Sequence, residues 1–74
     1  GEVKTQLVYE HYKGGRYVVL FVADESTNAR VGNQVVVYMS LTHGKVKCRD
    51  LNEFTEEIEW PDGVVRPRFI RATD

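Results

Sequence analysis

The chain has 74 residues, of which 42% are apolar and 28% are charged. A chain of this length can bury one compact core, which excludes a second domain. Ten Lys and Arg against eleven Asp and Glu leave a formal net charge of -1. Because no global field steers such a chain onto a polyphosphate backbone, binding to nucleic acid would need a local basic patch.

Cysteine content and hydropathy restrict the compartment. Cys48 is the only cysteine, which rules out an intrachain disulfide and a cysteine-based zinc site. No apolar stretch approaches the roughly 20 residues that span a bilayer. Residues 1–6 also lack the basic and apolar regions of a signal peptide. We therefore expect a cytoplasmic protein with no membrane partner.

Turn-forming residues separate short apolar runs at fairly even spacing, which predicts strands joined by hairpins. The runs at residues 17–23 and 35–41 are rich in β-branched and aromatic residues and are too short for typical core helices. We therefore expect these two runs to form the central strands of the sheet. In the first run we expect Tyr17, Val19 and Phe21 on one face and apolar residues on the other. Strong curvature or a second covering layer should then shield both faces.

The run KVKCR that follows alternates between cationic and apolar residues, as in a half-exposed antiparallel strand. We predict that Val46 and Cys48 point inward. Their neighbours Lys45, Lys47 and Arg49 should point to solvent. Cys48 would then be a small core residue rather than a nucleophile.

The remaining chain predicts one helical turn and a hairpin. Asp50 and Glu53 have the spacing of a capping box, so residues 51–54 should form a short turn that places its apolar residues on the core. Pro-Asp-Gly at 61–63 is a turn signal. The returning strand at residues 64–70 contains a proline, which restricts it to an edge or a short pairing.

These elements predict a mostly β fold of about five strands with one short helical turn. The natural arrangement is a small antiparallel SH3-like open barrel or roll. We expect residues 9–70 to form a single domain, with an N-terminal segment at 1–8 and a C-terminal tail at 71–74.

Short motifs follow one another in a distinctive order between residues 9 and 69, at Tyr9, His11, Lys13, Gly14, Tyr17, Val19, Ala23, Glu25, Thr27, Val36, Val37, Tyr38, Leu41, Arg49, Leu51, Phe54, Pro67, Arg68 and Phe69. Their order and spacing resemble DUF1653, a family of small bacterial and phage domains of unknown function. The chain departs from the family pattern at Lys47-Cys48, where the family tends to carry an aromatic residue followed by V-R-P-L, and in a longer loop at 24–34. The resemblance implies a compact β fold and brings no activity, substrate or cofactor with it.

A set of polar residues could converge at one end of such a barrel. Lys and Arg beside tyrosines would hold a phosphate-bearing ligand through charge-assisted contacts and stack its base on a ring. The alternative is that the glycines at 14–15 form a plain hairpin turn, that the tyrosines belong to the core, and that the arginines pair with acidic residues. The candidate binding residues are His11, Lys13, Arg16, Tyr38, Arg49, Arg66 and Arg68.

Catalytic and metal motifs are not apparent. His11 and His43, the two histidines, have no zinc-ligand spacing. No Ser or Thr sits in a nucleophile elbow or triad-like motif, and no glycine loop matches a nucleotide-hydrolase pattern. The acidic run after residue 52 is typical of a solvated face. We therefore expect no enzymatic activity, no metal and no cofactor.

The leading hypothesis is a non-enzymatic binding domain for a protein partner or a second copy, which would pair with an exposed edge such as residues 64–70. The alternative is a binder of a small nucleotide-like ligand, such as a sequestering protein of phage or mobile-element origin. A weak single-stranded nucleic-acid binder comes third, because the charge balance disfavours it.

Overall fold

The computed structural model describes residues 3–72. The predicted segments at 1–8 and 71–74 include residues 1, 2, 73 and 74, which lie outside the described residues. None of the described helices is long and apolar enough to cross a membrane. The elements are β1 (Val8–His11), β2 (Arg16–Asp24), the 3-10 helix η1 (Asn28–Arg30), β3 (Gln34–Ser40), β4 (Val46–Asp50), α1 (Leu51–Phe54), β5 (Glu57–Glu59), β6 (Val65–Pro67) and β7 (Phe69–Arg71).

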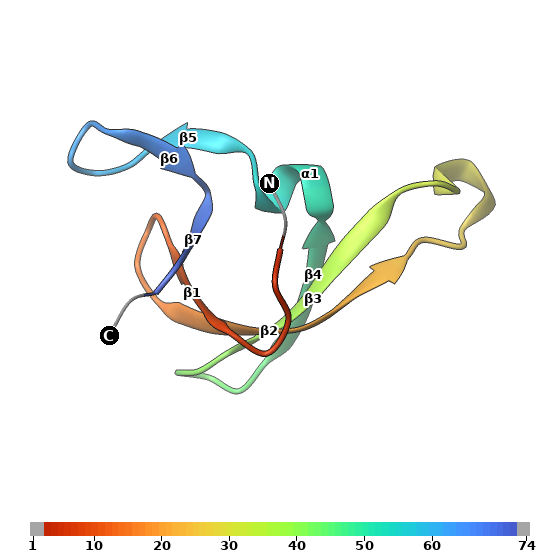
Figure 1. The fold of residues 1–74 in the computed structure, drawn as a ribbon. Helices are drawn as coiled ribbons and strands as arrows, with labels where there is room; N and C mark the ends of the chain where they lie inside the picture. Colours follow the sequence, from red (N-terminus) through yellow and green to blue (C-terminus); the bar gives the residue numbers. More distant parts are fainter. Residues whose placement is uncertain (1–2, 73–74) are drawn as a thin grey trace.

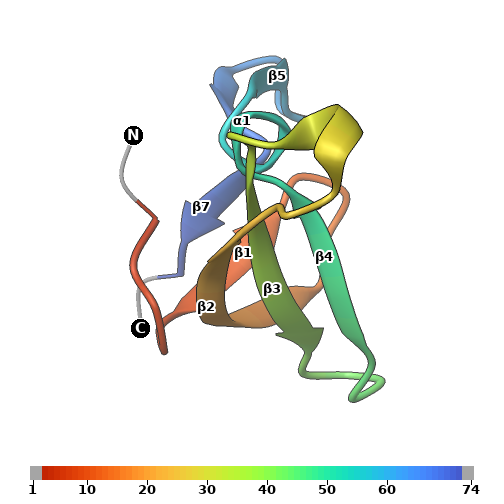
Figure 2. The same ribbon diagram turned by 90° about the vertical axis from the view of Figure 1, so that its right-hand side faces the viewer.

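The main sheet is antiparallel and has five strands in the order β4-β3-β2-β1-β7, which Figure 2 shows side by side. Strands β5 and β6 form a separate hairpin. The sheet curls, and α1 and this hairpin lie over its concave side (Figure 1). The expected mostly β roll with one helical turn is confirmed, and within residues 3–72 the sheet does not close into a barrel.

A β-bulge bends β2 and changes which side chains face inward. The pairing with β3 shifts register between Val19 and Phe21, so one extra residue turns the following side chains to the other face. Val19 is fully buried and Val22 packs against the core, whereas Phe21 is 54% exposed. The prediction that Phe21 shares a face with Tyr17 and Val19 is therefore wrong. The predicted curvature is present, and the bulge contributes to it.

The core forms between the concave face and α1. The rings of Phe54 on α1 and Phe69 on β7 stack with centroids 4.0 Å apart. The Asp50 carboxylate accepts a hydrogen bond from the Glu53 N–H at 3.1 Å, which confirms the predicted cap of the helical turn. The buried apolar residues of this core are Tyr9, Val19, Val36, Tyr38, Phe54 and Phe69.

Strand β4 faces the opposite way from the sequence prediction. Val46 is 59% exposed and Cys48 is exposed as well. Residues directly opposite each other in an antiparallel pair share a face, and Lys47 lies opposite the buried Tyr38. Arg49 is two residues further along and shares that face. The inward prediction for Val46 and Cys48 is thus wrong, because β4 is an edge strand at the open rim of the roll, where a long cationic side chain can face inward and still reach water.

The C-terminal strand predicted at residues 64–70 is divided in two at Arg68. Its first part, β6, pairs with β5, and its second part, β7, pairs with β1. Pro67 ends β6, which agrees with the short pairing expected from that proline. The Trp60 indole N–H donates to the Pro67 carbonyl at 3.0 Å and closes the hairpin over the roll.

Candidate functional site

Arg49 projects from β4 onto the aromatic side of the roll. Its guanidinium carbon lies 5.8 Å from the centroid of the Phe69 ring. Nε donates to the Tyr38 hydroxyl at 3.4 Å, and Nη1 donates to the Glu53 carboxylate at 2.8 Å. The hydrogen bond to Tyr38 is the main cause that raises the pKa of Arg49 above its ordinary value. Arg49 is therefore a permanent cation held in one orientation.

Arg68 approaches the same region from the junction between β6 and β7. Its Nε donates to the backbone carbonyl of Glu53 at 3.0 Å, and its Nη2 donates to the Glu56 carboxylate at 2.8 Å. The guanidinium carbon also lies 5.9 Å from the Tyr12 ring centroid. Arg49 and Arg68 are thus both tied to the region of α1, from opposite edges of the curled sheet.

Several cations lie close enough to His11 to affect its pKa. Burial is the main cause that lowers the pKa of His11 below 6.5, and the charges of Arg49, Arg68, Lys13 and Lys47 lower this pKa further. The Lys13 backbone N–H donates to His11 Nδ1 at 3.2 Å. The neutral imidazole therefore carries its proton on Nε2, where it can act as a hydrogen-bond donor.

Aromatic rings surround this imidazole. The His11 ring centroid lies 4.7 Å from that of Phe69, 4.8 Å from that of Tyr12 and 6.2 Å from that of Tyr17. Tyr17 and Tyr38 meet edge to face with centroids 5.5 Å apart. We call the concave side formed by these rings and their cations the cationic face; its cations are Lys13, Lys45, Lys47, Arg49 and Arg68.

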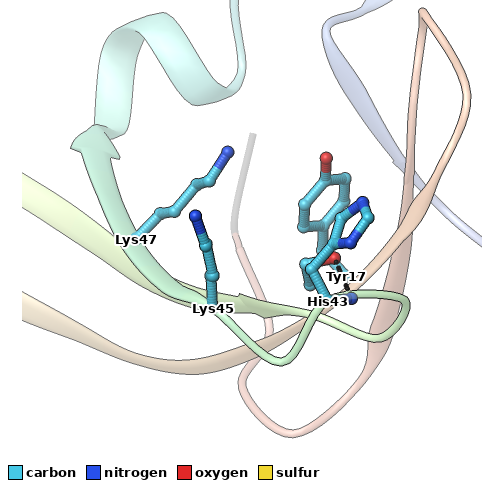
Figure 3. Close-up of a pocket in the computed structure, with 5 residues that line it drawn as sticks. Tyr17, His43, Lys45 and Lys47 are labelled. Atoms are coloured by element: carbon cyan, nitrogen blue, oxygen red, sulfur yellow. Dashed lines mark hydrogen bonds between the residues drawn. The ribbon is translucent and has the colours of Figure 1, made fainter.

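A pocket of about 250 Å³ opens on this face, lined by Tyr17, Ser40, His43, Lys45 and Lys47. We call it the Tyr17 pocket. Figure 3 shows Lys47 of β4 and Lys45 just before it on one side, and the rings of Tyr17 and His43 on the other. Among residues 3–72, no carboxylate pairs with either lysine. The pocket therefore presents positive charge beside an aromatic wall.

The acidic residues near α1 have structural partners. A second hollow of about 390 Å³ is lined by Asn52, Glu53 and Glu56. Glu53 pairs with Arg49 and Glu56 pairs with Arg68, each at 2.8 Å. In the part of the chain that the structure describes, no three His, Cys, Asp or Glu side chains gather as they would around a metal ion.

The structure brings together most of the residues that the sequence singled out. His11, Lys13, Tyr38, Arg49 and Arg68 all belong to the cationic face.

Two of the predicted residues lie elsewhere. Arg66 is in the β5–β6 hairpin, where it pairs with Asp62 at 2.6 Å and lies 5.3 Å from the Trp60 ring centroid. Arg16 begins β2 opposite Glu10. It precedes Tyr17 in the strand and so belongs to the opposite face.

Sequence reasoning did not select Ser40, His43, Lys45 and Lys47. The alternation of KVKCR places its cations on one face, and both lysines are exposed as predicted, but the sequence gives no sign that they also line a pocket. The inward face of β4 follows from its pairing with β3, which local sequence does not specify.

Comparisons with known proteins agree with this fold. A family model described as "Protein of unknown function (DUF1653)" matches residues 7–71. A crystal structure of a protein belonging to DUF1653 from Bordetella bronchiseptica is 28% identical, covers 96% of this chain and 94% of its own, and has a TM-score of 0.75. No curated protein matches the chain. The resemblance that the sequence indicated is thereby confirmed.

Proposed function

We propose that this chain, which belongs to the DUF1653 family, is a non-enzymatic binding domain that takes an anionic group of its partner onto the cationic face. One observation carries the proposal: Lys47 and Arg49 on β4, together with Lys45 just before it, lie on the same side of the sheet as the aromatic rings, where both lysines remain exposed. Like charges on one face of a strand repel one another, and Glu53 offsets only Arg49, so an anion of a partner would reduce the repulsion that remains between the lysines.

The chemistry of the face fits an anion better than a catalytic reaction. Charge-assisted hydrogen bonds from Lys and Arg are about twice as strong as neutral ones. Within residues 3–72, no Ser, Thr or Cys side chain is hydrogen-bonded to the imidazole of His11 or His43, so no nucleophile is paired with a base. Binding rather than turnover is therefore the better supported function.

A protein partner is the second candidate, and the convex face of the sheet favours it. Phe21 lies opposite Val37, which lies opposite Cys48, so three neighbouring strands present these side chains on the same face. Val46 on the same edge strand is 59% exposed. The edge at residues 64–70 is less suitable for strand addition, because it bends at Arg68 and its parts β6 and β7 have only three residues each.

A thermal-shift screen tests the anionic partner. The panel would contain inorganic phosphate, pyrophosphate, nucleotides and acidic peptides. Because a ligand at a hundredfold excess over its Kd stabilises the fold by about 2.7 kcal/mol, binding would raise the melting temperature clearly. The shift should shrink with added salt, since the contact is between charges near the surface. A flat response to every anion overturns the proposal.

The protein-partner candidate is tested by size-exclusion chromatography with light scattering, together with capture of defined partners. Phe21→Ser would weaken association through the convex face, and Arg30→Gln in the loop that contains η1 is a remote control. A monomer at all concentrations that captures no partner contradicts this candidate.

A further inference from the structure

We infer that the Tyr17 pocket binds a small ligand that contains both a phosphate monoester and a planar ring, as a nucleoside monophosphate does on its ribose. The inference rests on the proposed function, because it names the ligand that the cationic face would take. It depends on three features of the pocket: two neighbouring lysines, the hydroxyl group of Ser40 and an aromatic wall.

The two lysines are placed to share one phosphate. Lys45 and Lys47 are two residues apart along the chain, so they project to the same side from points about 7 Å apart. Figure 3 shows both side chains rising into the space above β4. Lysine binds phosphate as a mobile point charge, and two of them can approach the same dianion.

No acidic residue lines the pocket, and the carboxylates of Glu53 and Glu56 are already paired with Arg49 and Arg68. Within residues 3–72, the ammonium groups of Lys45 and Lys47 therefore have no carboxylate partner, and they are the cations of this face that line the pocket.

Ser40 supplies a hydroxyl group that a ligand in the pocket could contact. Its side chain lines the pocket although the residue is only 5% exposed. Its Oγ accepts a hydrogen bond from the His43 backbone N–H at 3.1 Å. In residues 3–72, no acceptor receives the proton of its own hydroxyl group. The hydroxyl can therefore donate this proton to a group in the pocket, such as a phosphate oxygen.

The wall opposite the lysines is aromatic. The ring of Tyr17 is held edge to face against Tyr38 and Phe69, with centroids 5.5 and 5.6 Å away. A ring fixed in this way loses little conformational entropy when a ligand stacks on it. Stacking of a base on an aromatic side chain contributes roughly 1 to 3 kcal/mol. Figure 3 shows the His43 imidazole on the same side of the pocket as Tyr17.

The size of the pocket favours a small ligand over a polymer. A volume of about 250 Å³ lies just below the range of pockets that enclose a drug-sized molecule. It would hold one phosphate and part of one ring, and the rest of the ligand would remain in solvent. The net charge of -1 also disfavours tracking along a nucleic-acid backbone.

Isothermal titration and amide chemical-shift mapping on the full chain test this inference. The ligands are the four ribonucleoside 5′-monophosphates, the matching nucleosides, ribose 5-phosphate and inorganic phosphate. We expect at least one monophosphate to bind about tenfold or more tightly than its nucleoside, ribose 5-phosphate or phosphate, because it alone supplies both ring and charge. The amides of Ser40, His43, Lys45 and Lys47 should shift.

Matched variants separate the pocket from general charge. Lys45→Gln with Lys47→Gln should weaken binding at least about tenfold, because the loss of even one charge-assisted hydrogen bond lowers affinity by about that factor. Arg30→Gln with Arg66→Gln removes the same net charge outside the pocket and should leave affinity within about twofold. All four residues lie at the surface, so both double variants should keep the melting curve of a folded domain.

The possible failures are distinguishable. Equal losses in the two double variants, or ribose 5-phosphate binding as tightly as the monophosphate, would overturn the pocket inference. If no monophosphate binds but pyrophosphate or an acidic peptide shifts amides around Arg49 and Arg68, the pocket inference is wrong and the proposed function stands. If no anion binds at all, both are wrong.

Discussion

The cationic face and the β5–β6 hairpin contain similar local motifs in different surroundings. Each places a guanidinium over an aromatic ring, with Arg49 at 5.8 Å from Phe69 and Arg66 at 5.3 Å from Trp60. Each also pairs its arginine with a carboxylate four residues away in sequence, Glu53 for Arg49 and Asp62 for Arg66.

The difference lies in the balance of charge around each arginine. Asp62 accepts from both Nη atoms of Arg66, and these hydrogen bonds are the main cause that lowers the pKa of Asp62. The hairpin pair is thus satisfied within itself. Near Arg49, the charges of Arg68, Lys13 and Lys47 also reach His11. An arginine beside a ring therefore does not by itself indicate a binding site, and the proposed site depends on the excess of cations around shared rings.

The largest effect should come from Phe54→Ala, which removes the ring beneath the cationic face. Phe54 is fully buried and stacks on Phe69, so we expect a loss of about 3 to 5 kcal/mol. Because a domain of this size has only a few kcal/mol of net stability, the variant should be largely unfolded by circular dichroism and urea titration. Ile58→Ala in the half-buried part of the hairpin is the control. If both variants lose the same stability, the hairpin is as much a part of the core as α1.

A smaller effect is expected for the cap that holds α1 at the rim of the cationic face. Asp50→Ala removes the acceptor of the Glu53 N–H and should cost about 1 kcal/mol. The urea midpoint should fall with an unchanged m-value. Asp50→Ser retains a cap acceptor and should recover most of the loss. Failure of serine to recover stability would show that Asp50 acts through its charge and not through the cap.

The pH dependence of stability should distinguish the two regions through His11. Its folded pKa is lowered below 6.5, mainly by burial, so the unfolded state binds the proton more readily. The stability that His11 contributes is full above pH 6.5 and is lost as the pH falls through the lowered folded pKa. His11→Phe keeps a ring in this position, so the urea midpoint of the variant should change less between pH 7 and pH 5 than that of the wild type. An identical slope in wild type and variant would contradict the assignment to His11.

The smallest effect should follow Arg66→Gln. The Arg66–Asp62 pair is exposed, and exposed pairs contribute little because solvent screens them. The urea midpoint and the affinity for any anion of the cationic face should both match wild type. Arg49→Gln, measured in parallel, should reduce that affinity. Equal losses of affinity would mean that the hairpin belongs to the binding surface.

Local features were predictable because neighbouring residues determine them. The helical turn after Asp50 required only the capping-box spacing, and the short pairing of β6 required only Pro67. Tyr38, Arg49 and Arg68 were selected as site residues for their chemistry and their place in family motifs. Arg66 has the same chemistry, but its partner Asp62 is in its own hairpin, and residue type alone does not distinguish the two situations.

By itself, the sequence determined a mostly β fold, its turns, its capped helical turn and its family, because turn chemistry and hydrophobic runs are local. Only the tertiary structure decided which face of β4 is inward and where Phe21 points. The bulge in β2 and the open rim of the roll control both, since a strand's inward face depends on its partner strand and on whether the sheet closes. As a result, Lys45 and Lys47, although exposed, line a pocket beside the aromatic rings.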